Sequence, residues 1–200
     1  ELIIQTEQKE FAIFGGTFDP IHLGHLHLIK EVANKFDKVL VIPSGKPWLK
    51  PHTPIASARQ RFQMADLAIT SMGLSGKVEV LPLEVNRDGD SYTLDTVNEL
   101  SIKYPNTNFT LVLGSDAAKS IGQWHKSAEL LQKVKVLVIS RPGSAPSDFD
   151  EVNSSKVINL LPYLSLNLFK SLILSDIKNM FSNSSFSIIL KISNKSIVGV

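Results

Sequence analysis

Short runs of apolar, often β-branched residues alternate with longer amphipathic stretches along most of this chain, and this alternation constrains the fold more than any other feature. The apolar runs are "FAIF" at 11–14, "KVLVIP" at 38–43, "VEVLPLE" at 78–84, "FTLVLG" at 109–114 and "VKVLVIS" at 134–140. Each run is apolar at successive positions, so both faces of the strand are expected to be covered. This is typical of a parallel sheet with helices on both sides.

The stretches between these runs repeat their apolar residues at intervals of three and four, which predicts helices. The helices are expected at about 24–35, 56–72, 93–104 and 126–132. In the first of them, Leu26, Ile29 and Ala33 mark the face that we expect to be buried. Strands alternating with helices in this way predict a doubly wound, Rossmann-like α/β domain.

The size and composition of the chain fit one domain of this kind. Its 200 residues, 43% of them hydrophobic, are enough for one sizeable core. We expect the Rossmann-like core over residues 1–150 and a divergent C-terminal segment over 151–200 that packs on the same domain. This segment is rich in Ser, Asn, Ile and Leu. Within it the pattern weakly predicts strands at 157–161 and 187–192 and a helix at about 172–182.

Charge and composition exclude several classes of function. The net charge of +2 argues against a dedicated nucleic-acid-binding surface, and the lack of cysteine excludes disulfides, thiolate nucleophiles and cysteine-ligated zinc. The start, "ELIIQTEQKE", lacks the basic flank and long apolar run of a secretory signal. The most apolar later stretch, 157–174, is interrupted by Pro162, Asn167 and Lys170. We therefore expect a soluble, cytoplasmic protein with no membrane or nucleic-acid partner.

The stretch "GGTFDPIHLGH" at 15–25 connects the first predicted strand to the first predicted helix. Ligands of open parallel sheets bind at loops of this kind. Gly15 and Gly16 allow a sharp turn and a close approach of a ligand to the main chain. His22 and His25 fall in the first helical turn on one side of the helix, beside unpaired N–H groups and the positive end of the helix dipole. The arrangement predicts a polyphosphate site in which the imidazoles donate hydrogen bonds to phosphate oxygens.

Two other interpretations of these histidines stay open on the sequence. His22 is equally suited to capping the helix at the surface, with His25 as a hydrogen-bonded histidine of the core. A zinc site that includes His27 is less well supported, because no cluster of further ligands accompanies it.

"GGTFDPIHLGH" resembles the signature of the nucleotidyltransferases, which move a nucleotidyl group from ATP or CTP to a phosphate acceptor. Further motifs resemble, in the same order, the landmarks of nicotinate-nucleotide adenylyltransferases, particularly those of actinobacteria. These motifs are "PSGKPWLK" at 43–50, "RQRFQMADLAI" at 59–69, "SYTLDT" at 91–96, "GSDA" at 114–117, Trp124 and "SRPG" at 140–143. The resemblance covers about residues 10–143.

The resemblance implies that the phosphate of nicotinate mononucleotide attacks the α-phosphorus of ATP, giving pyrophosphate and the dinucleotide precursor of NAD. Such a transfer needs no enzyme nucleophile, which agrees with a chain without cysteine or a Ser/His/Asp arrangement. ATP is expected to arrive with Mg²⁺. Because the sequence shows no cage of carboxylates, we expect phosphates and water to hold the ion and predict no metal-binding residues.

The matching positions of the family imply a role for each site residue. His22, His25 and Lys50 would contact the ATP phosphates as catalytic residues. Tyr92 and Thr93 would offer polar groups to the nicotinate carboxylate, and Trp124 would stack on the pyridine ring. The remaining ATP-binding positions would be Gly15, Gly16, Thr17, Phe18, Gly114, Asp116, Arg141, Ser175 and Lys178.

Several of these residues also have a purely structural interpretation. Tyr92, Thr93 and Asp116 would serve as helix caps and Trp124 as packing, whereas charges such as Lys50 and Arg141 are commonly solvated. The order of all the motifs together favours the functional interpretation.

The C-terminal part departs from the family pattern. The family closes with I-S-S-T-x-[IC]-R, whereas this chain has "ILSDIKNM" at 173–180, with Ser175 for the Thr and Lys178 for the Arg. Lysine lacks the bidentate fork of arginine. Either divergence of this lineage or an altered reading frame near residue 150 accounts for the difference. Alternatives are therefore an adenylyltransferase for pantetheine phosphate or nicotinamide mononucleotide, or a nucleotide-binding protein with impaired catalysis. The sequence leaves the oligomeric state open, a homo-oligomer included.

Overall fold

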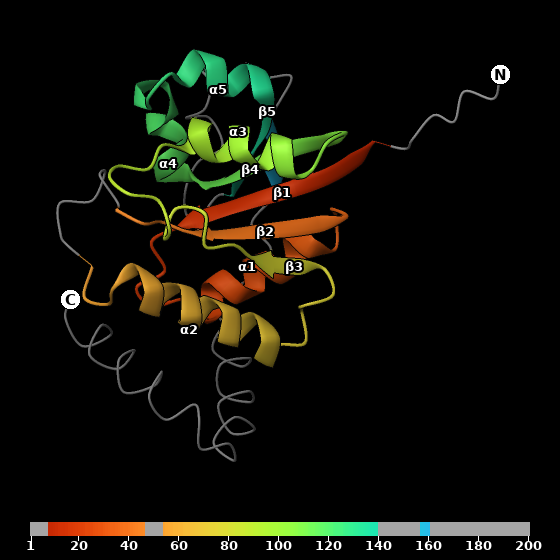
Figure 1. The fold of residues 1–200 in the computed structure, drawn as a ribbon. Coiled ribbons are helices and arrows are strands. Elements are labelled where there is room, and N and C mark those ends of the chain that lie inside the picture. The colour runs from red at the N-terminus through yellow and green to blue at the C-terminus, as the bar shows by residue number, and fades with distance from the viewer. Residues whose placement is uncertain (1–7, 47–53, 140–156, 161–200) are drawn as a thin grey trace.

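A single parallel sheet forms the centre of the computed structural model, which describes residues 8–46, 54–139 and 157–160 (Figure 1). Its six strands follow the order β3-β2-β1-β4-β5-β6, and every neighbouring pair is parallel. The strands are β1 Lys9–Gly16, β2 Lys38–Pro43, β3 Val78–Val80, β4 Thr107–Gly114, β5 Val134–Ile139 and β6 Val157–Leu160.

Helices cover both faces of this sheet (Figure 1). The helices are α1 Leu23–Ala33, α2 Ala58–Ser71, α3 Thr93–Lys103, α4 Ser115–Ser120, the 3₁₀ turn η1 Ile121–Gln123 and α5 Ser127–Lys133. Helices α1 and α2 pack on one face, whereas α3, α4 and α5 pack on the other. The predicted doubly wound α/β architecture is confirmed.

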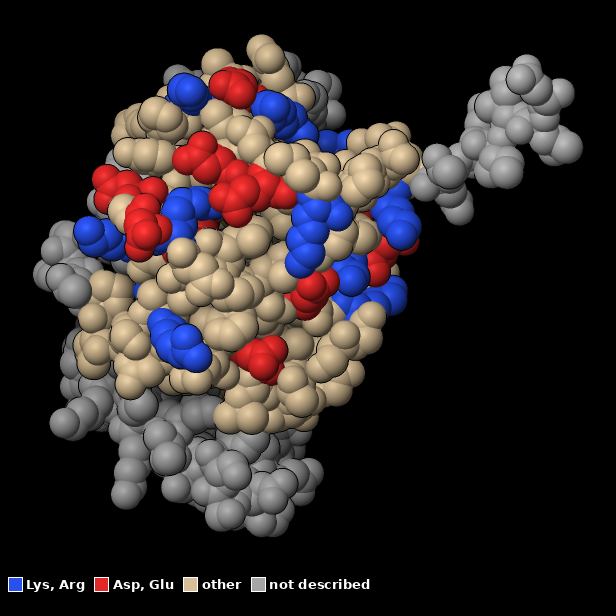
Figure 2. Space-filling model, viewed as in Figure 1, with Lys and Arg blue, Asp and Glu red and all other residues tan. Residues whose placement is uncertain are grey.

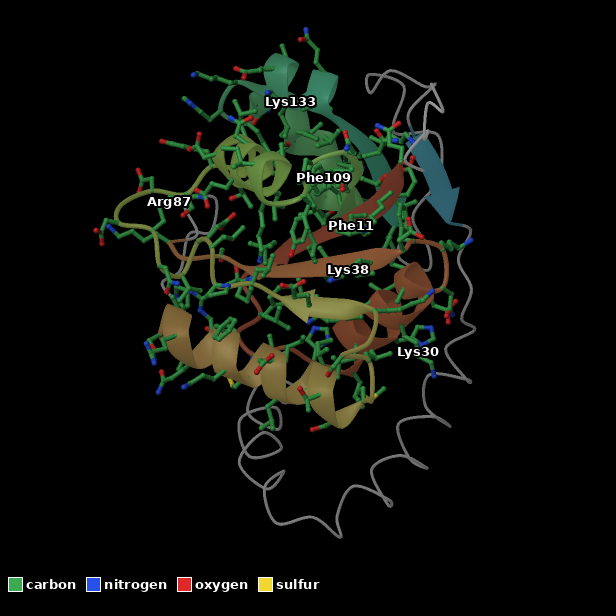
Figure 3. The ribbon with its side chains drawn as sticks, turned by 45° about the vertical axis from the view of Figure 1, so that its right-hand side comes forward. Phe11, Lys30, Lys38, Arg87, Phe109 and Lys133 are labelled. Atoms are coloured by element: carbon green, nitrogen blue, oxygen red, sulfur yellow. The ribbon has the colours of Figure 1, made fainter. Side chains whose placement is uncertain are left out.

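Alternating side chains of the strands feed two separate cores. In β1, Phe11 and Ile13 enter the core beneath α3, and Ala12 and Phe14 enter the core beneath α1. Phe11 meets Phe109 of β4 on the α3 face, edge to face with ring centroids 6.4 Å apart (Figure 3). The prediction that the strands are buried on both faces is therefore confirmed.

The helix boundaries follow from local sequence signals. In α1 the predicted face of Leu26, Ile29 and Ala33 is buried, together with Val32. Helix α2 begins at Ala58, two residues later than predicted, because Ser57 and Gln60 form a reciprocal capping box there.

None of the helices in the described ranges is long and apolar enough to cross a lipid bilayer.

Two local predictions were wrong. The third strand ends at Val80, although the apolar run suggested an end at Glu84. Pro82 has no N–H for the ladder, and its carbonyl accepts a hydrogen bond from Asn86 in a turn. Helix α4 was missed, because six residues are too few to show a helical period.

The region after residue 150 contributes an edge strand to the sheet. The strand predicted at 157–161 is confirmed as β6, which pairs in parallel with β5. The helix predicted at about 172–182 and the strand predicted at 187–192 lie outside the described residues.

The sheet has one topological switch point, between β1 and β4. The chain runs outward from β1 through β2 to β3, then returns to the other side of β1 and runs outward again through β4, β5 and β6. In open α/β sheets, ligands bind outside the carboxyl ends of the strands at such a point. Here those ends are Gly16 of β1 and Gly114 of β4.

Candidate functional site

The loop after β1 takes its shape from the side chain of Phe18. This residue has a left-handed φ of 50°, and its ring is buried and stacks on Phe14 with centroids 6.0 Å apart. A Cβ on Gly16 would lie 2.9 Å from two atoms of the Phe18 ring, so a larger residue there would require the buried ring to shift. The peptide bond between Asp19 and Pro20 is cis. The packing of Phe18 thus fixes the main chain of Gly16 at the switch point.

Open space adjoins the two strand ends that flank the switch point. A Cβ added to Gly15 or to Gly114 would meet nothing within 4 Å, and both residues are exposed. Across from the first loop, Gly114 is the N-cap of α4, and Asp116 stands exposed in the first turn of this helix. The prediction that Asp116 caps the helix was therefore wrong. The main chain is accessible to a ligand on both sides of the switch point.

His22 and His25 form the N-terminal cap of α1. The Nδ1 of His22 accepts a hydrogen bond from the His25 N–H at 3.4 Å, and the Nδ1 of His25 accepts one from the His22 N–H at 3.3 Å. The rings stack with centroids 3.7 Å apart, and His25 also meets the Phe18 ring edge to face. The interpretation of His22 as a surface cap is confirmed, and so is the prediction that both rings lie on one side of the helix.

This cap determines which nitrogen of each imidazole ring carries the proton at the N-terminus of α1. Because each Nδ1 acts as an acceptor, the proton of a neutral ring sits on Nε2. Capping and phosphate binding are therefore compatible, since they use different nitrogens. Within the described ranges, no group of three or more His, Asp or Glu side chains is placed to hold a metal ion.

Arg61 of α2 was not among the site residues predicted from the sequence. Its side chain is 1% exposed, and its guanidinium donates to three main-chain carbonyls from three segments. These are Thr17 at 2.6 Å, Gly45 at 3.0 Å and Ala56 at 3.2 Å. The available signal was a charged residue on the face of the helix that also carries the buried residues Ala65 and Ala68. Arg61 joins the loops that follow β1 and β2 to the start of α2.

The charge of Arg61 is balanced only in part. Burial lowers the pKa of its guanidinium, and the nearby Asp19 carboxylate acts in the opposite direction. The Asp19 carboxylate also accepts hydrogen bonds from the N–H groups of Ile55 at 2.6 Å and Ala56 at 3.1 Å. The Asp19 carboxylate thus binds the N–H groups of residues 55 and 56, and the Arg61 guanidinium binds the carbonyl of residue 56.

The predicted acceptor residues gather at the N-terminus of α3. Tyr92 is the N-cap residue and Thr93 the first helical residue, although within the described residues the side chain of Tyr92 makes no capping hydrogen bond. The Tyr92 ring stacks on His125, with centroids 4.2 Å apart. Trp124, the neighbour of His125, is partly buried and donates from Nε1 to Ser120 Oγ at 3.4 Å. The contact of Tyr92 with His125, which was not predicted, thus places Tyr92 beside the segment that carries Trp124.

The remaining predicted site residues divide into two groups. Thr17 is buried in the first loop, where its carbonyl accepts from Arg61. Lys50, Arg141, Ser175 and Lys178 lie outside the described residues. On the face shown in Figure 2, acidic and basic side chains are interspersed. An anionic ligand would therefore depend on donors placed close to it rather than on the overall charge of the protein.

Comparisons with known proteins agree on one family. The sequence profile described as Cytidylyltransferase-like matches residues 13–189. A protein of Dehalococcoides mccartyi named "Probable nicotinate-nucleotide adenylyltransferase" is 38% identical over 147 residues, covering 71% of this chain and 70% of its own length. A protein of the same name from Oceanobacillus iheyensis is 38% identical over 151 residues, covering 72% of this chain and 77% of its own.

A solved structure shares the fold. The Plasmodium falciparum nicotinic acid mononucleotide adenylyltransferase, solved in complex with APC, superposes with a TM-score of 0.65 at 22% identity. The superposition covers 78% of this chain and 77% of that one. The nucleotidyltransferase-like Rossmann fold is thereby established for this chain.

Replacing Arg61 is expected to destabilise the protein strongly. Arg61→Ala leaves one buried and two partly buried carbonyls without their donor, and we expect the free energy of unfolding to fall by about 3 kcal/mol. Urea denaturation measures this change. Arg59→Ala on the same helix, where the side chain is exposed, is the matched control and should change stability by less than ~0.5 kcal/mol. Equal effects of the two variants would contradict the role given to Arg61.

The capping geometry makes a prediction about the tautomers of His22 and His25. In the neutral form, both rings are expected to carry their proton on Nε2, because Nδ1 accepts the cap hydrogen bond. Nitrogen-15 NMR of histidine-labelled protein distinguishes the two tautomers directly. Protonation at Nδ1 of either neutral ring would show that the cap does not persist in solution.

Proposed function

We propose that this chain, which belongs to the cytidylyltransferase-like family and to its nicotinate-nucleotide adenylyltransferases, is an adenylyltransferase. It joins ATP and nicotinate mononucleotide into nicotinate adenine dinucleotide. Pyrophosphate is the second product, and the reaction is a step of NAD biosynthesis. The observation that carries this proposal is the position of "GGTFDPIHLGH", which forms the loop and first helical turn at the topological switch point.

The ATP phosphates would bind at the N-terminus of α1. The first-turn N–H groups and the positive end of the helix dipole favour an anion there. The Nε2–H groups of His22 and His25 supply donors from one side of the same turn, and the exposed main chain at Gly15 supplies room for close approach. Gly16, Thr17 and Phe18 would shape this contact, and Gly114 and Asp116 would hold the adenosine ribose across the switch point.

The transfer itself would be a direct displacement. A phosphate oxygen of nicotinate mononucleotide forms a bond to the α-phosphorus of ATP, while the bond from that phosphorus to the bridging oxygen of the β-phosphate breaks. Pyrophosphate leaves with the electron pair of that bond. Such a reaction requires alignment of two anions and stabilisation of the charge that develops on phosphate oxygens, which the two imidazoles and the helix N-terminus would provide.

We treat MgATP as the substrate form of the nucleotide. The described residues place no cluster of three or more acidic or imidazole groups around a common point. A magnesium ion that keeps its bonds to substrate phosphates and water suits such a site, because Mg²⁺ is commonly held in this way. The ion would offset charge on the leaving pyrophosphate.

The acceptor would bind at the N-terminus of α3. The carboxylate of nicotinate suits the first-turn N–H groups at Tyr92 and Thr93. The pyridine ring suits the aromatic side chain of Trp124, which lies next in the chain to the stacked His125. Stacking of a ring of this size contributes about 1–3 kcal/mol. The acid form of the pyridine nucleotide is therefore the proposed acceptor.

Four further positions complete the proposal on the ATP side. Lys50, Arg141, Ser175 and Lys178 are proposed as ATP contacts on the strength of the family resemblance alone. The C-terminal segment after residue 150 is proposed to pack on the same domain, as β6 does.

Removing either imidazole should reduce turnover sharply. We expect His22→Ala and His25→Ala each to lower kcat about 100-fold, because each removes one donor to the phosphates. Pyrophosphate release from MgATP and nicotinate mononucleotide measures the rate. His27→Ala, two residues further along α1, is the matched control and should leave kcat unchanged.

The same assay tests the acceptor. Wild-type protein should release pyrophosphate with nicotinate mononucleotide and little with nicotinamide mononucleotide or pantetheine phosphate. Wild-type rates in both histidine variants would contradict the phosphate role, and tight ATP binding without turnover on any acceptor would indicate a nucleotide-binding protein instead.

A further inference from the structure

The two proposed half-sites are joined by a series of hydrogen bonds and main-chain contacts through the loops that follow β2 and β3. On the ATP side, Arg61 donates to the carbonyls of Thr17 and Gly45. Gly45 lies so close to the next segment that a Cβ on it would overlap the carbonyl oxygen of Glu84. The main-chain N–H of Gly45 also faces the Glu84 carboxyl group closely enough to lower its pKa. The loop after β2 is thus in direct main-chain contact with the loop after β3.

The Glu84 carboxylate continues this path to α3. Its Oε1 accepts a hydrogen bond from the Thr96 hydroxyl at 2.9 Å. The Thr96 side chain is 1% exposed and lies one turn into α3, with its Oγ1 also 3.4 Å from the carbonyl of Tyr92. Because Tyr92 is the N-cap residue, the group that holds Thr96 also holds the first turn of the helix.

The surroundings of Glu84 show that it does not act as a solvated surface charge. Burial raises the pKa of Glu84, whereas the hydrogen bond from Thr96, the charge of Arg87 and the N–H of Gly45 oppose that shift. Arg87 lies on the loop before α3 (Figure 3), where it donates to Thr96 Oγ1 at 3.4 Å and forms an ion pair with Glu99. The carboxylate is therefore held by groups from three segments.

In the described part of the chain, the serine hydroxyls of the loops after β2 and β3 do not connect the two loops. Ser44 precedes Gly45 and Ser91 precedes Tyr92, and within the described residues both buried hydroxyls lack a hydrogen-bond partner. Ser91 Oγ is 3.6 Å from the position of a Gly45 Cβ, so the two segments are close there without being bonded. The link between them passes through Glu84.

We propose that Glu84 is a positioning residue that fixes the first turn of α3, and with it the acceptor site, against the loop that follows β2. The inference rests on the proposed function for the identity of the acceptor. Loss of the Thr96–Glu84 hydrogen bond should lower the affinity for nicotinate mononucleotide, because the proposed acceptor site includes the first turn of α3. ATP should be affected much less, because its loop is held independently by Arg61 and Phe18.

A pair of substitutions at Thr96 tests this inference. Thr96→Val keeps the shape of the side chain but removes the hydroxyl, whereas Thr96→Ser keeps the hydroxyl and is the matched control. We expect Thr96→Val to raise the KM for nicotinate mononucleotide about 10-fold, with the KM for MgATP within twofold of wild type. Thr96→Ser should retain both values. A merely structural defect would change both KM values or lower kcat alone.

A second readout does not depend on activity. Amide hydrogen exchange followed by NMR on the protein without substrates should show faster exchange at the Gly45 N–H in Thr96→Val, although Thr96 does not touch Gly45. Glu84→Gln should have the same effect, because an amide side chain has one acceptor oxygen where the carboxylate has two. Exchange at Val39 and Val41, in the centre of β2, should stay at the wild-type rate in both variants.

The outcomes separate this inference from the proposed function. Unchanged exchange at Gly45 together with an unchanged KM for nicotinate mononucleotide would overturn the role of Glu84 while leaving the enzyme activity intact. If wild-type protein released no pyrophosphate with any acceptor, the proposed function would fail. The Gly45 exchange rates would then decide by themselves whether Glu84 links the two loops.

Discussion

The parallel pairing of β1 with β4 is the constraint on which the rest of this structure depends. It brings Gly16 and Gly114 to one edge of the sheet, although they lie far apart in the sequence. Helix α1 then leaves from one side of this junction and α4 from the other. Because Gly15 and Gly114 are exposed beside this junction, the fold itself provides a place where an anionic nucleotide can approach main-chain N–H groups.

Buried polar groups hold the loops around this junction in one arrangement. Arg61 donates hydrogen bonds to the loops after β1 and β2, and Glu84 accepts one from Thr96 of α3. In a reaction that proceeds by alignment of two nucleotides, the accuracy of such supporting contacts matters as much as the groups that touch substrate. This explains why charged residues that would be costly to bury alone are placed here with several partners each.

The sequence was sufficient for the architecture and for the first loop, because apolar periodicity and glycine placement are local signals. It predicted the strands within a few residues, apart from the end of β3 at Val80, and it predicted the buried face of α1. It did not reveal Arg61, His125 or Glu84 as parts of the site, since their partners come from other loops and hydrogen bonding across loops has no period. The histidine pair shows the same limit, because the reciprocal hydrogen bonds between each Nδ1 and the main chain could not be predicted from the sequence.

A crystal structure with a non-hydrolysable ATP analogue and nicotinate mononucleotide would test the central claim most directly. The account predicts triphosphate density at the N-terminus of α1, within hydrogen-bonding distance of Nε2 of His22 and His25, and a pyridine ring against Trp124. The phosphate of the acceptor should point towards the α-phosphorus across the β1–β4 junction. Triphosphate density elsewhere on the protein, with both imidazoles turned into the core, would contradict the account.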